Sequence, residues 1–182
     1  MIDTLWVVIL IMKIIKDKDF LTDKHKHFIS EFLLKSDFAY FIQPRSTFDD
    51  NYIMMEHICL RRYDKHWNTA NVEMYEDILN TFCKKHKIKY KKILRCSVNL
   101  TFNVGVEKSL VHRDHKESHK QLLIYCNDVA DKESYTVILD KKRNPIEKIK
   151  PIQYSAVSFG ENHHYHYYPK KGHRVVLVYT FK

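Results

Sequence analysis

A series of short apolar runs decides the fold, and it begins at ILRCSVNLTFNV (93–104). Polar turns such as NDVADKE (127–133) and KKRNP (141–145) separate its members. The later runs are QLLIYC (121–126), SYTVIL (134–139), IEKIKPIQ (146–153), YSAVSF (154–159), YHYY (165–168) and RVVLVYTF (174–181). Closely spaced short strands of this composition predict an all-β sandwich or barrel over the second half of the chain.

Two amphipathic helices are expected before these runs. Thr22 can cap the first helix, within 20–37, and Asn71 can cap the second, within 71–87. Their apolar residues recur at helical spacing: Phe28, Ile29, Phe32 and Leu33 in the first, and Tyr75, Ile78, Leu79 and Phe82 in the second. Segments 38–44 and 51–60 resemble strands. The predicted fold is α+β and mainly β, with N-terminal helices packed on one side.

The length of 182 residues suits a single domain. In this prediction, residues 1–92 supply helical support and the first strands, and residues 93–182 form the β core. The opening LWVVILIM (5–12) is apolar for only eight residues. Such a run is too short to span a bilayer, so a buried first strand is expected there and no membrane association.

The charge balance is strongly basic, with 31 Lys and Arg against 22 Asp and Glu, a formal charge of +9. This suggests an acidic partner such as nucleic acid, an anionic small molecule or an anionic surface. The alternative is a lysine-rich composition spread over solvated faces, since only KKHKIKYKK (84–92) forms a dense run. The four cysteines, Cys59, Cys83, Cys96 and Cys126, are widely spaced, which predicts free thiols in a reducing, cytoplasmic compartment.

The stretch SLVHRDHKES (109–118) contains a His-x-Asp motif. If the segment is extended, His112 and Asp114 leave the same face, and together they can supply two ligands of a divalent metal. The same letters also suit a solvated polar loop. His115 and His119 are expected to be solvated or to lie behind the ligands.

The segment SFGENHHYHYYPKKGHRVVLVYTFK (158–182) supplies the context for this motif. If 163–168 pairs with 173–178 as a hairpin, a histidine near position 164 lies close to Arg174 across the ladder. Two histidines and one carboxylate on one face of an iron leave three positions open, as in non-haem Fe(II) oxygenases. A guanidinium beside them suits the far carboxylate of a dicarboxylate.

The order of these elements resembles the Fe(II)- and 2-oxoglutarate-dependent dioxygenases, in particular the prolyl-hydroxylase-like group and its small viral and microbial relatives. The elements are His-x-Asp, LLIYCND (122–128), SYTVIL, IKPIQYSAVSF (149–159), a histidine, and Gly-x-Arg before an apolar strand. The resemblance covers about 93–182. It implies a double-stranded β-helix, a jelly-roll or cupin-like barrel.

Carried over residue by residue, the resemblance makes His112 and Asp114 the first two iron ligands. His164 is the distal ligand, because a glycine eight residues later and an arginine ten residues later are typical of the family. His163 and His166 remain alternatives. Arg174 would bind the 5-carboxylate of 2-oxoglutarate, and the hydroxyl of Tyr125 would assist it.

The implied activity is hydroxylation of a C–H bond in a peptide or amino-acid side chain, with Fe(II), 2-oxoglutarate and O2, and with ascorbate as a further candidate. The basic charge keeps a nucleobase-directed dioxygenase as an alternative. A non-catalytic metal-binding β-barrel is the alternative from another class. Residues 37–68 are a candidate lid over the site.

Overall fold

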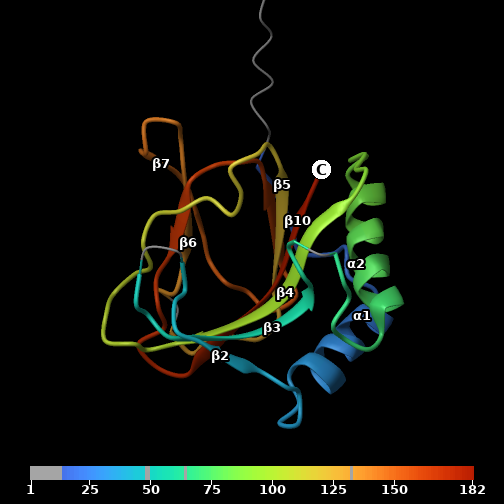
Figure 1. Cartoon of the computed structure of the whole chain (residues 1–182), viewed down its shortest axis with the longest axis horizontal. Coiled ribbons are helices and arrows are strands. Elements are labelled where there is room, and N and C mark those ends of the chain that lie inside the picture. The colour runs from blue at the N-terminus through green and yellow to red at the C-terminus, as the bar shows by residue number, and fades with distance from the viewer. Residues whose placement is uncertain (1–13, 48–49, 64, 132) are drawn as a thin grey trace, which may run out of the picture.

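The computed structural model describes residues 14–47, 50–63, 65–131 and 133–182 (Figure 1). The strand expected at 5–12 lies outside the described residues. Two β-sheets face each other, and the helices cover the outer face of the larger sheet (Figure 1). The predicted α+β, mainly β class is confirmed, and so is the position of the helices on one side.

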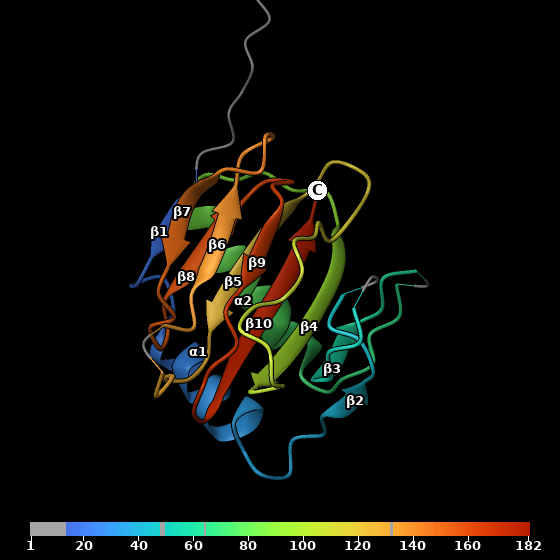
Figure 2. The same cartoon turned by 90° about the vertical axis from the view of Figure 1, so that its left-hand side faces the viewer.

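The larger sheet has seven strands in the order β1-β8-β5-β10-β4-β3-β2, and every pairing in it is antiparallel. Its strands are β1 (Ile15–Asp17), β2 (Phe41–Gln43), β3 (Met54–Leu60), β4 (Ile93–Phe102), β5 (Lys120–Tyr125), β8 (Ala156–Phe159) and β10 (His173–Phe181). The smaller sheet pairs β7 (Pro145–Ile149) with β6 (Thr136–Leu139) and β6 with β9 (His164–His166). It lies in front of the larger sheet in Figure 2.

Helix α1 (Asp23–Phe28) continues into the π-helical turn η1 (Ile29–Leu33), and α2 (Val72–Lys85) packs beside them. Thr22 caps α1 as predicted, since its side chain accepts a hydrogen bond from the backbone N–H of His25. Asn71 precedes α2, but it adopts a left-handed conformation (φ 58°) and its side chain makes no capping hydrogen bond. No helix among the described residues is long and apolar enough to cross a membrane.

Alternation along the central strands separates two cores. Leu122 and Ile124 of β5 face the helices, whereas Leu123 and Tyr125 face the space between the sheets. The helical stripes predicted from the sequence pack into the first core, together with all four cysteines. All four cysteines are buried and free, as expected. The second core leaves the opposite end of the inter-sheet space open for polar residues.

The predicted hairpin between 163–168 and 173–178 is wrong. β9 pairs with β6, where Ile138 lies opposite His164, and β10 pairs with β4 and β5. The turn at 169–172 instead carries the chain from the smaller sheet to the larger one. The reason is burial: β10 is apolar on both faces and takes the centre of the larger sheet, which needs a partner on each side. His164 and Arg174 therefore come from opposite sheets.

Candidate metal centre

The loop between β4 and β5 is held along β9 by backbone hydrogen bonds. The N–H of His112 donates to the carbonyl of His164 at 3.0 Å, and the N–H of His164 donates back at 3.0 Å. Three residues earlier in the loop, the N–H of Ser109 donates to the carbonyl of His166 at 2.9 Å. These backbone hydrogen bonds hold the His-x-Asp motif of the loop beside His164, which is distant in sequence.

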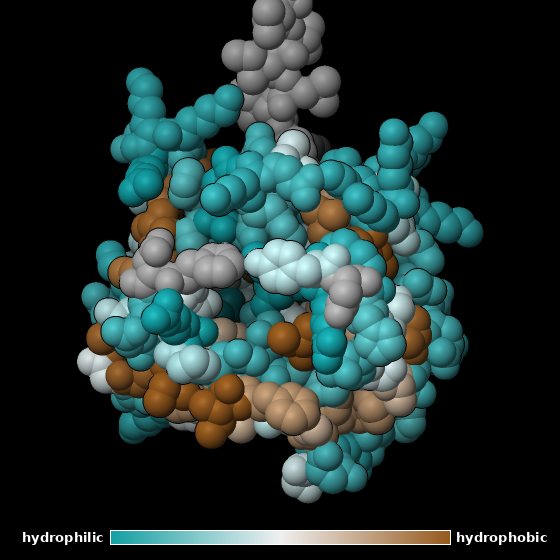
Figure 3. Space-filling model, viewed as in Figure 1, coloured by the Kyte–Doolittle hydropathy of each residue, from teal (hydrophilic) through white to brown (hydrophobic). Residues whose placement is uncertain are grey.

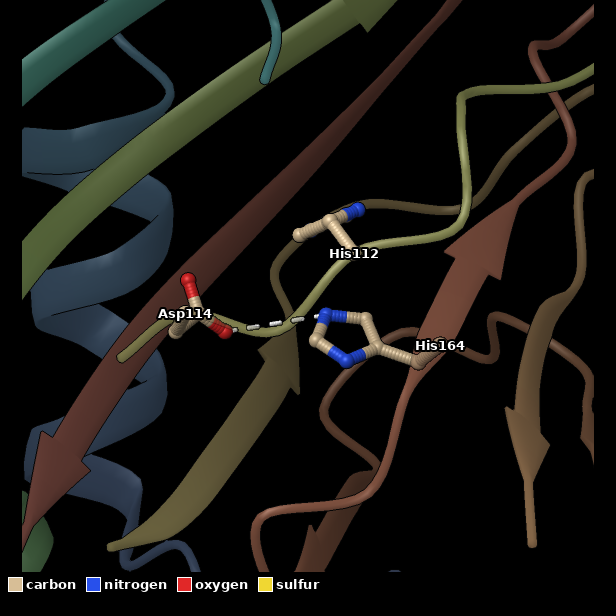
Figure 4. A group of neighbouring side chains, drawn as sticks. All are labelled: His112, Asp114 and His164. Atoms are coloured by element: carbon tan, nitrogen blue, oxygen red, sulfur yellow. Dashed lines mark ion pairs between the residues drawn. The ribbon is translucent and has the colours of Figure 1, made fainter. Parts of the chain in front are cut away.

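Three side chains converge at this point: His112, Asp114 and His164 (Figure 4). Their potential ligand atoms all lie within 4.8 Å of one another. His164 Nε2 is 3.6 Å from Asp114 Oδ2, and the two imidazole centroids are 4.4 Å apart. One carboxylate oxygen and two imidazole nitrogens gathered in this way form a donor set that suits a divalent first-row metal.

Backbone carbonyls orient both imidazoles. Nδ1 of His112 lies 3.0 Å from the carbonyl of Leu110, and Nδ1 of His164 lies 3.2 Å from the carbonyl of Asn162. A carbonyl oxygen only accepts, so each Nδ1 carries the proton in these bonds. The lone pair is then on Nε2, which is the arrangement that second-sphere carbonyls give to metal-binding histidines.

Asp114 is held ionised by arginines. Its Oδ1 lies 3.3 Å from Nη1 of Arg95 and 3.9 Å from Nη2 of Arg62, and Arg62 also donates to its backbone carbonyl at 2.7 Å. Burial alone would raise the pKa of Asp114, but interaction with the protonated form of His164 and with the guanidinium of Arg95 lowers it well below its usual value. Oδ1 is occupied by the guanidinium groups, whereas Oδ2 faces His164.

His164 is neutral at physiological pH. Burial lowers its pKa to about 4, and the nearby His112 acts in the same direction against the opposing effect of Asp114. A neutral imidazole is the form that coordinates a metal. Asp114 and His164 are thus already in their coordinating forms.

The stability of the metal-free protein is expected to fall as the pH is lowered from about 6.5 to about 4. Burial lowers the pKa of His115, like that of His164, to about 4. In this window the unfolded chain takes up protons that the folded chain does not. For His164 alone, the free energy of unfolding is expected to fall by about 1.4 kcal/mol per pH unit in this window. Urea unfolding of chelator-treated protein across the window measures this loss. His115→Gln should make the free energy of unfolding depend less steeply on pH. A urea midpoint that does not change with pH in the unmodified protein would contradict this prediction.

A pocket of about 900 Å³ opens over the three side chains and extends between the sheets. The space-filling view shows a hollow on this face with largely hydrophilic surroundings (Figure 3). Three protein ligands leave further coordination positions of a metal open, and here they would face the pocket. The volume is within the range of small-molecule sites.

Arg174 lies in the same pocket and is only 4% exposed. Its Nη2 donates to Thr136 Oγ1 at 2.6 Å, and the guanidinium lies 5.4 Å from the ring centroid of Tyr125. Its Nε has no hydrogen-bond partner, and no carboxylate among the described residues pairs with it. Since a buried charge is costly without a counter-charge, this arginine is suited to an anionic ligand.

Tyr125 lies behind this arginine rather than in the pocket wall. Its hydroxyl donates to Thr136 Oγ1 at 2.9 Å, so Thr136 links Tyr125 to Arg174. The hydroxyl is fully buried. Tyr125 can position the guanidinium directly and through Thr136, whereas direct contact with a ligand would require the side chain to move.

The other histidines lie outside the group of three. His166 follows His164 on the same face of β9 and lines the pocket, as does His163, but neither joins the cluster of ligand atoms. His173 is exposed. His119 is buried rather than solvated, and its ring packs edge-on against His115.

Sequence reasoning missed Arg62 and Arg95, which hold Asp114. They lie outside the motif, on segments that only long-range pairing brings to the centre, so local patterns do not reveal them. A usable signal was their residue type, because arginine is rare in this lysine-rich chain.

No protein-family model and no curated protein matches the chain. Solved structures do. A 2-oxoglutarate–Fe(II) oxygenase family protein from Burkholderia pseudomallei superposes with a TM-score of 0.71 at 14% identity, covering 94% of this chain and 85% of its own. A viral collagen prolyl hydroxylase from Paramecium bursaria Chlorella virus-1 gives 0.60 at 14% identity, covering 92% and 94%. A Trichoplax adhaerens prolyl hydroxylase, solved with a hypoxia-inducible-factor peptide, gives 0.66 at 12% identity, covering 92% and 82%.

At these identities the likeness concerns the fold, and it extends over nearly the whole chain. The chain has the fold of the Fe(II)- and 2-oxoglutarate-dependent oxygenases.

Proposed function

We propose that the chain is an Fe(II)- and 2-oxoglutarate-dependent dioxygenase that hydroxylates a C–H bond of an organic substrate. The observation that carries the proposal is the placement of a buried arginine, which no acid among the described residues pairs with, in the same pocket as two histidines and a carboxylate. The two facing sheets then correspond to a double-stranded β-helix with the centre at its open end.

In this proposal His112, Asp114 and His164 hold Fe(II). Arg174 binds the 5-carboxylate of 2-oxoglutarate, and Tyr125 and Thr136 keep the guanidinium in place. Arg95 and Arg62 keep Asp114 ionised with Oδ2 turned toward His164. The buried strands around Arg174 exclude water from the carboxylate site, which strengthens this charge-assisted contact.

The bound iron and 2-oxoglutarate supply the oxidising chemistry: O2 gives one oxygen atom to the substrate C–H bond and one to succinate, and CO2 leaves. The chain contributes rigid placement. His112 and Asp114 come from a loop that is hydrogen-bonded to β9, and His164 comes from β9 itself. Arg174 comes from the opposite sheet. Sites held on strands in this way keep the geometry that such chemistry requires.

A peptide or amino-acid side chain is the substrate that the prolyl hydroxylases among the similar structures suggest. The candidate lid supports a role in substrate choice, because Gln43–Thr47 and Arg61–Tyr63 form part of the pocket wall. The arginine-rich lining of that wall favours a second candidate, a nucleic-acid substrate. The buried free cysteines are compatible with work in a reducing compartment, as we propose.

The proposal is tested by turnover. Purified protein with Fe(II), ascorbate, O2 and 2-oxoglutarate should form succinate slowly without substrate, and Asp114→Ala should not. The matched control Asp128→Ala removes a carboxylate outside the pocket and should keep the rate. Tight Zn binding without any succinate would instead support the non-catalytic metal-binding protein.

A further inference from the structure

The arginines of the chain are all gathered in one place. The sequence contains seven arginines and 24 lysines. All seven arginines line the pocket over the metal centre, and none of the described lysines does. The residues are Arg45, Arg61, Arg62, Arg95, Arg113, Arg143 and Arg174. A general excess of basic residues on solvated faces does not produce this separation of the two residue types.

The seven arginines form layers. Arg174 is innermost and buried, and Arg62 and Arg95 lie beside Asp114. The outer four come from four separate segments around the opening: the loop after β2, the end of β3, the loop after β4 and the β6–β7 turn. They are Arg45, Arg61, Arg113 and Arg143. Of these, Arg113 is half-buried and the other three are exposed.

The wall of the pocket has a net positive charge. Its only acids among the described residues are Glu56 and Asp114, and both pair with Arg95. In the proposed enzyme, the charges of Fe(II) and of doubly ionised 2-oxoglutarate cancel. The excess of arginines over acids among the described lining residues therefore persists when the cofactors are bound, and it favours an anionic substrate.

Arginine rather than lysine at every basic position of the wall indicates the kind of anion. The guanidinium fork binds phosphate or carboxylate through two parallel hydrogen bonds, whereas lysine acts as a point charge. Because the outer arginines come from separate segments of the pocket lining, they suit a polymer that carries an anionic group in every repeating unit better than a ligand with a single anionic group.

We propose that the substrate is a single-stranded nucleic acid, whose phosphates are bound by the outer arginines while one nucleotide enters the pocket. This inference rests on the proposed function. Tyr63 lines the same pocket, directly after Arg61 and Arg62 in the sequence, and is 85% exposed. An exposed aromatic ring beside arginines is a platform on which a base can stack.

A single strand fits better than a duplex, because the reacting carbon must reach a centre that is inside a pocket. A base in a duplex would first have to leave the stack, which costs a few kcal/mol. A neutral peptide would offer no anionic group to the outer arginines. An acidic or phosphorylated peptide would use them, and it is therefore the competitor in the test.

The test measures binding by fluorescence anisotropy with a fluorescein-labelled single-stranded oligonucleotide of mixed sequence, under anaerobic conditions with Fe(II) and 2-oxoglutarate. We expect affinity to fall as salt rises. Arg45→Gln combined with Arg143→Gln should weaken binding about tenfold. The matched control, Lys24→Gln combined with Lys89→Gln, removes the same charge from exposed positions outside the pocket and should change binding little.

Tyr63→Ala should weaken binding without reducing the salt dependence, because stacking releases no counterions. Equal loss in the lysine variant would overturn the proposal, since binding would then reflect overall charge. Tighter binding of a matched phosphopeptide or acidic peptide than of the oligonucleotide would also overturn it.

A second readout separates this inference from the proposed function. The oligonucleotide should accelerate succinate formation, and the arginine variant should lose that acceleration while retaining its slow rate without substrate. Normal succinate formation with no response to the oligonucleotide would overturn the substrate assignment alone. Absence of succinate under all conditions, with oligonucleotide binding retained, would overturn the oxygenase.

Discussion

Replacing Arg174 by methionine is expected to weaken 2-oxoglutarate binding by about two to four orders of magnitude, because a bound carboxylate would lose its buried charge partner, at a cost of about 3–5 kcal/mol. The same change should stabilise the free protein by about 1 kcal/mol or more, since it removes a buried charge that no carboxylate among the described residues balances. Methionine fills much of the volume of the arginine stem. Weaker 2-oxoglutarate binding together with a more stable free protein would identify Arg174 as a ligand-binding residue.

Two measurements check this prediction: anaerobic calorimetric titration of the Fe(II)-loaded protein with 2-oxoglutarate, and urea unfolding of the free protein. Arg143→Met is the matched control, because it removes an exposed arginine of the same pocket. It should leave both quantities nearly unchanged. Destabilisation of the Arg174 variant with normal 2-oxoglutarate affinity would show that the arginine is structural.

Replacing His164 by alanine is expected to reduce iron affinity at least about a hundredfold, since loss even of groups that merely orient a ligand typically costs ten- to a hundredfold. The fold should persist. The side-chain contacts described for this imidazole are with the carbonyl of Asn162, with Asp114 and with the rings of His112 and Phe159. Iron binding is measured by anaerobic titration with a competing chelator, and the fold by circular dichroism.

His163→Ala and His166→Ala are the matched controls, one on each side of the ligand in the sequence. Both residues line the pocket but lie outside the cluster of ligand atoms, so their loss should leave iron affinity within a few-fold of normal. If either variant loses iron while His164→Ala retains it, the distal ligand has been assigned to the wrong histidine.

The strands of the second half were predictable because their composition and turns are local signals. β4, β6 and β8 fall within apolar runs visible in the sequence, and β5 and β10 begin one residue before theirs. The pairing of β9 with β6 was not predictable, because it depends on which sheet can bury each run. A short turn suggested a hairpin, but the apolar character of both faces of β10 placed it in the centre of the other sheet.

The candidate site shows the same division between local and long-range information. Spacing pointed to His112 and Asp114, and the family resemblance, through Gly172 and Arg174, implied His164. In the structure, backbone hydrogen bonds between the loop and β9, and not a β9–β10 hairpin, bring the three side chains together. The pairing of Asp114 with Arg95 and the burial of His119 depend on long-range packing, which spacing does not encode.

The most direct test of the account is the visible absorption of the protein after anaerobic addition of Fe(II) and then 2-oxoglutarate. We expect a weak charge-transfer band that appears only when both are present, persists in His163→Ala and disappears in His112→Ala. Such a band requires iron held with open positions beside the site for the co-substrate. Absence of the band from protein that demonstrably contains iron would contradict the assignment of this centre.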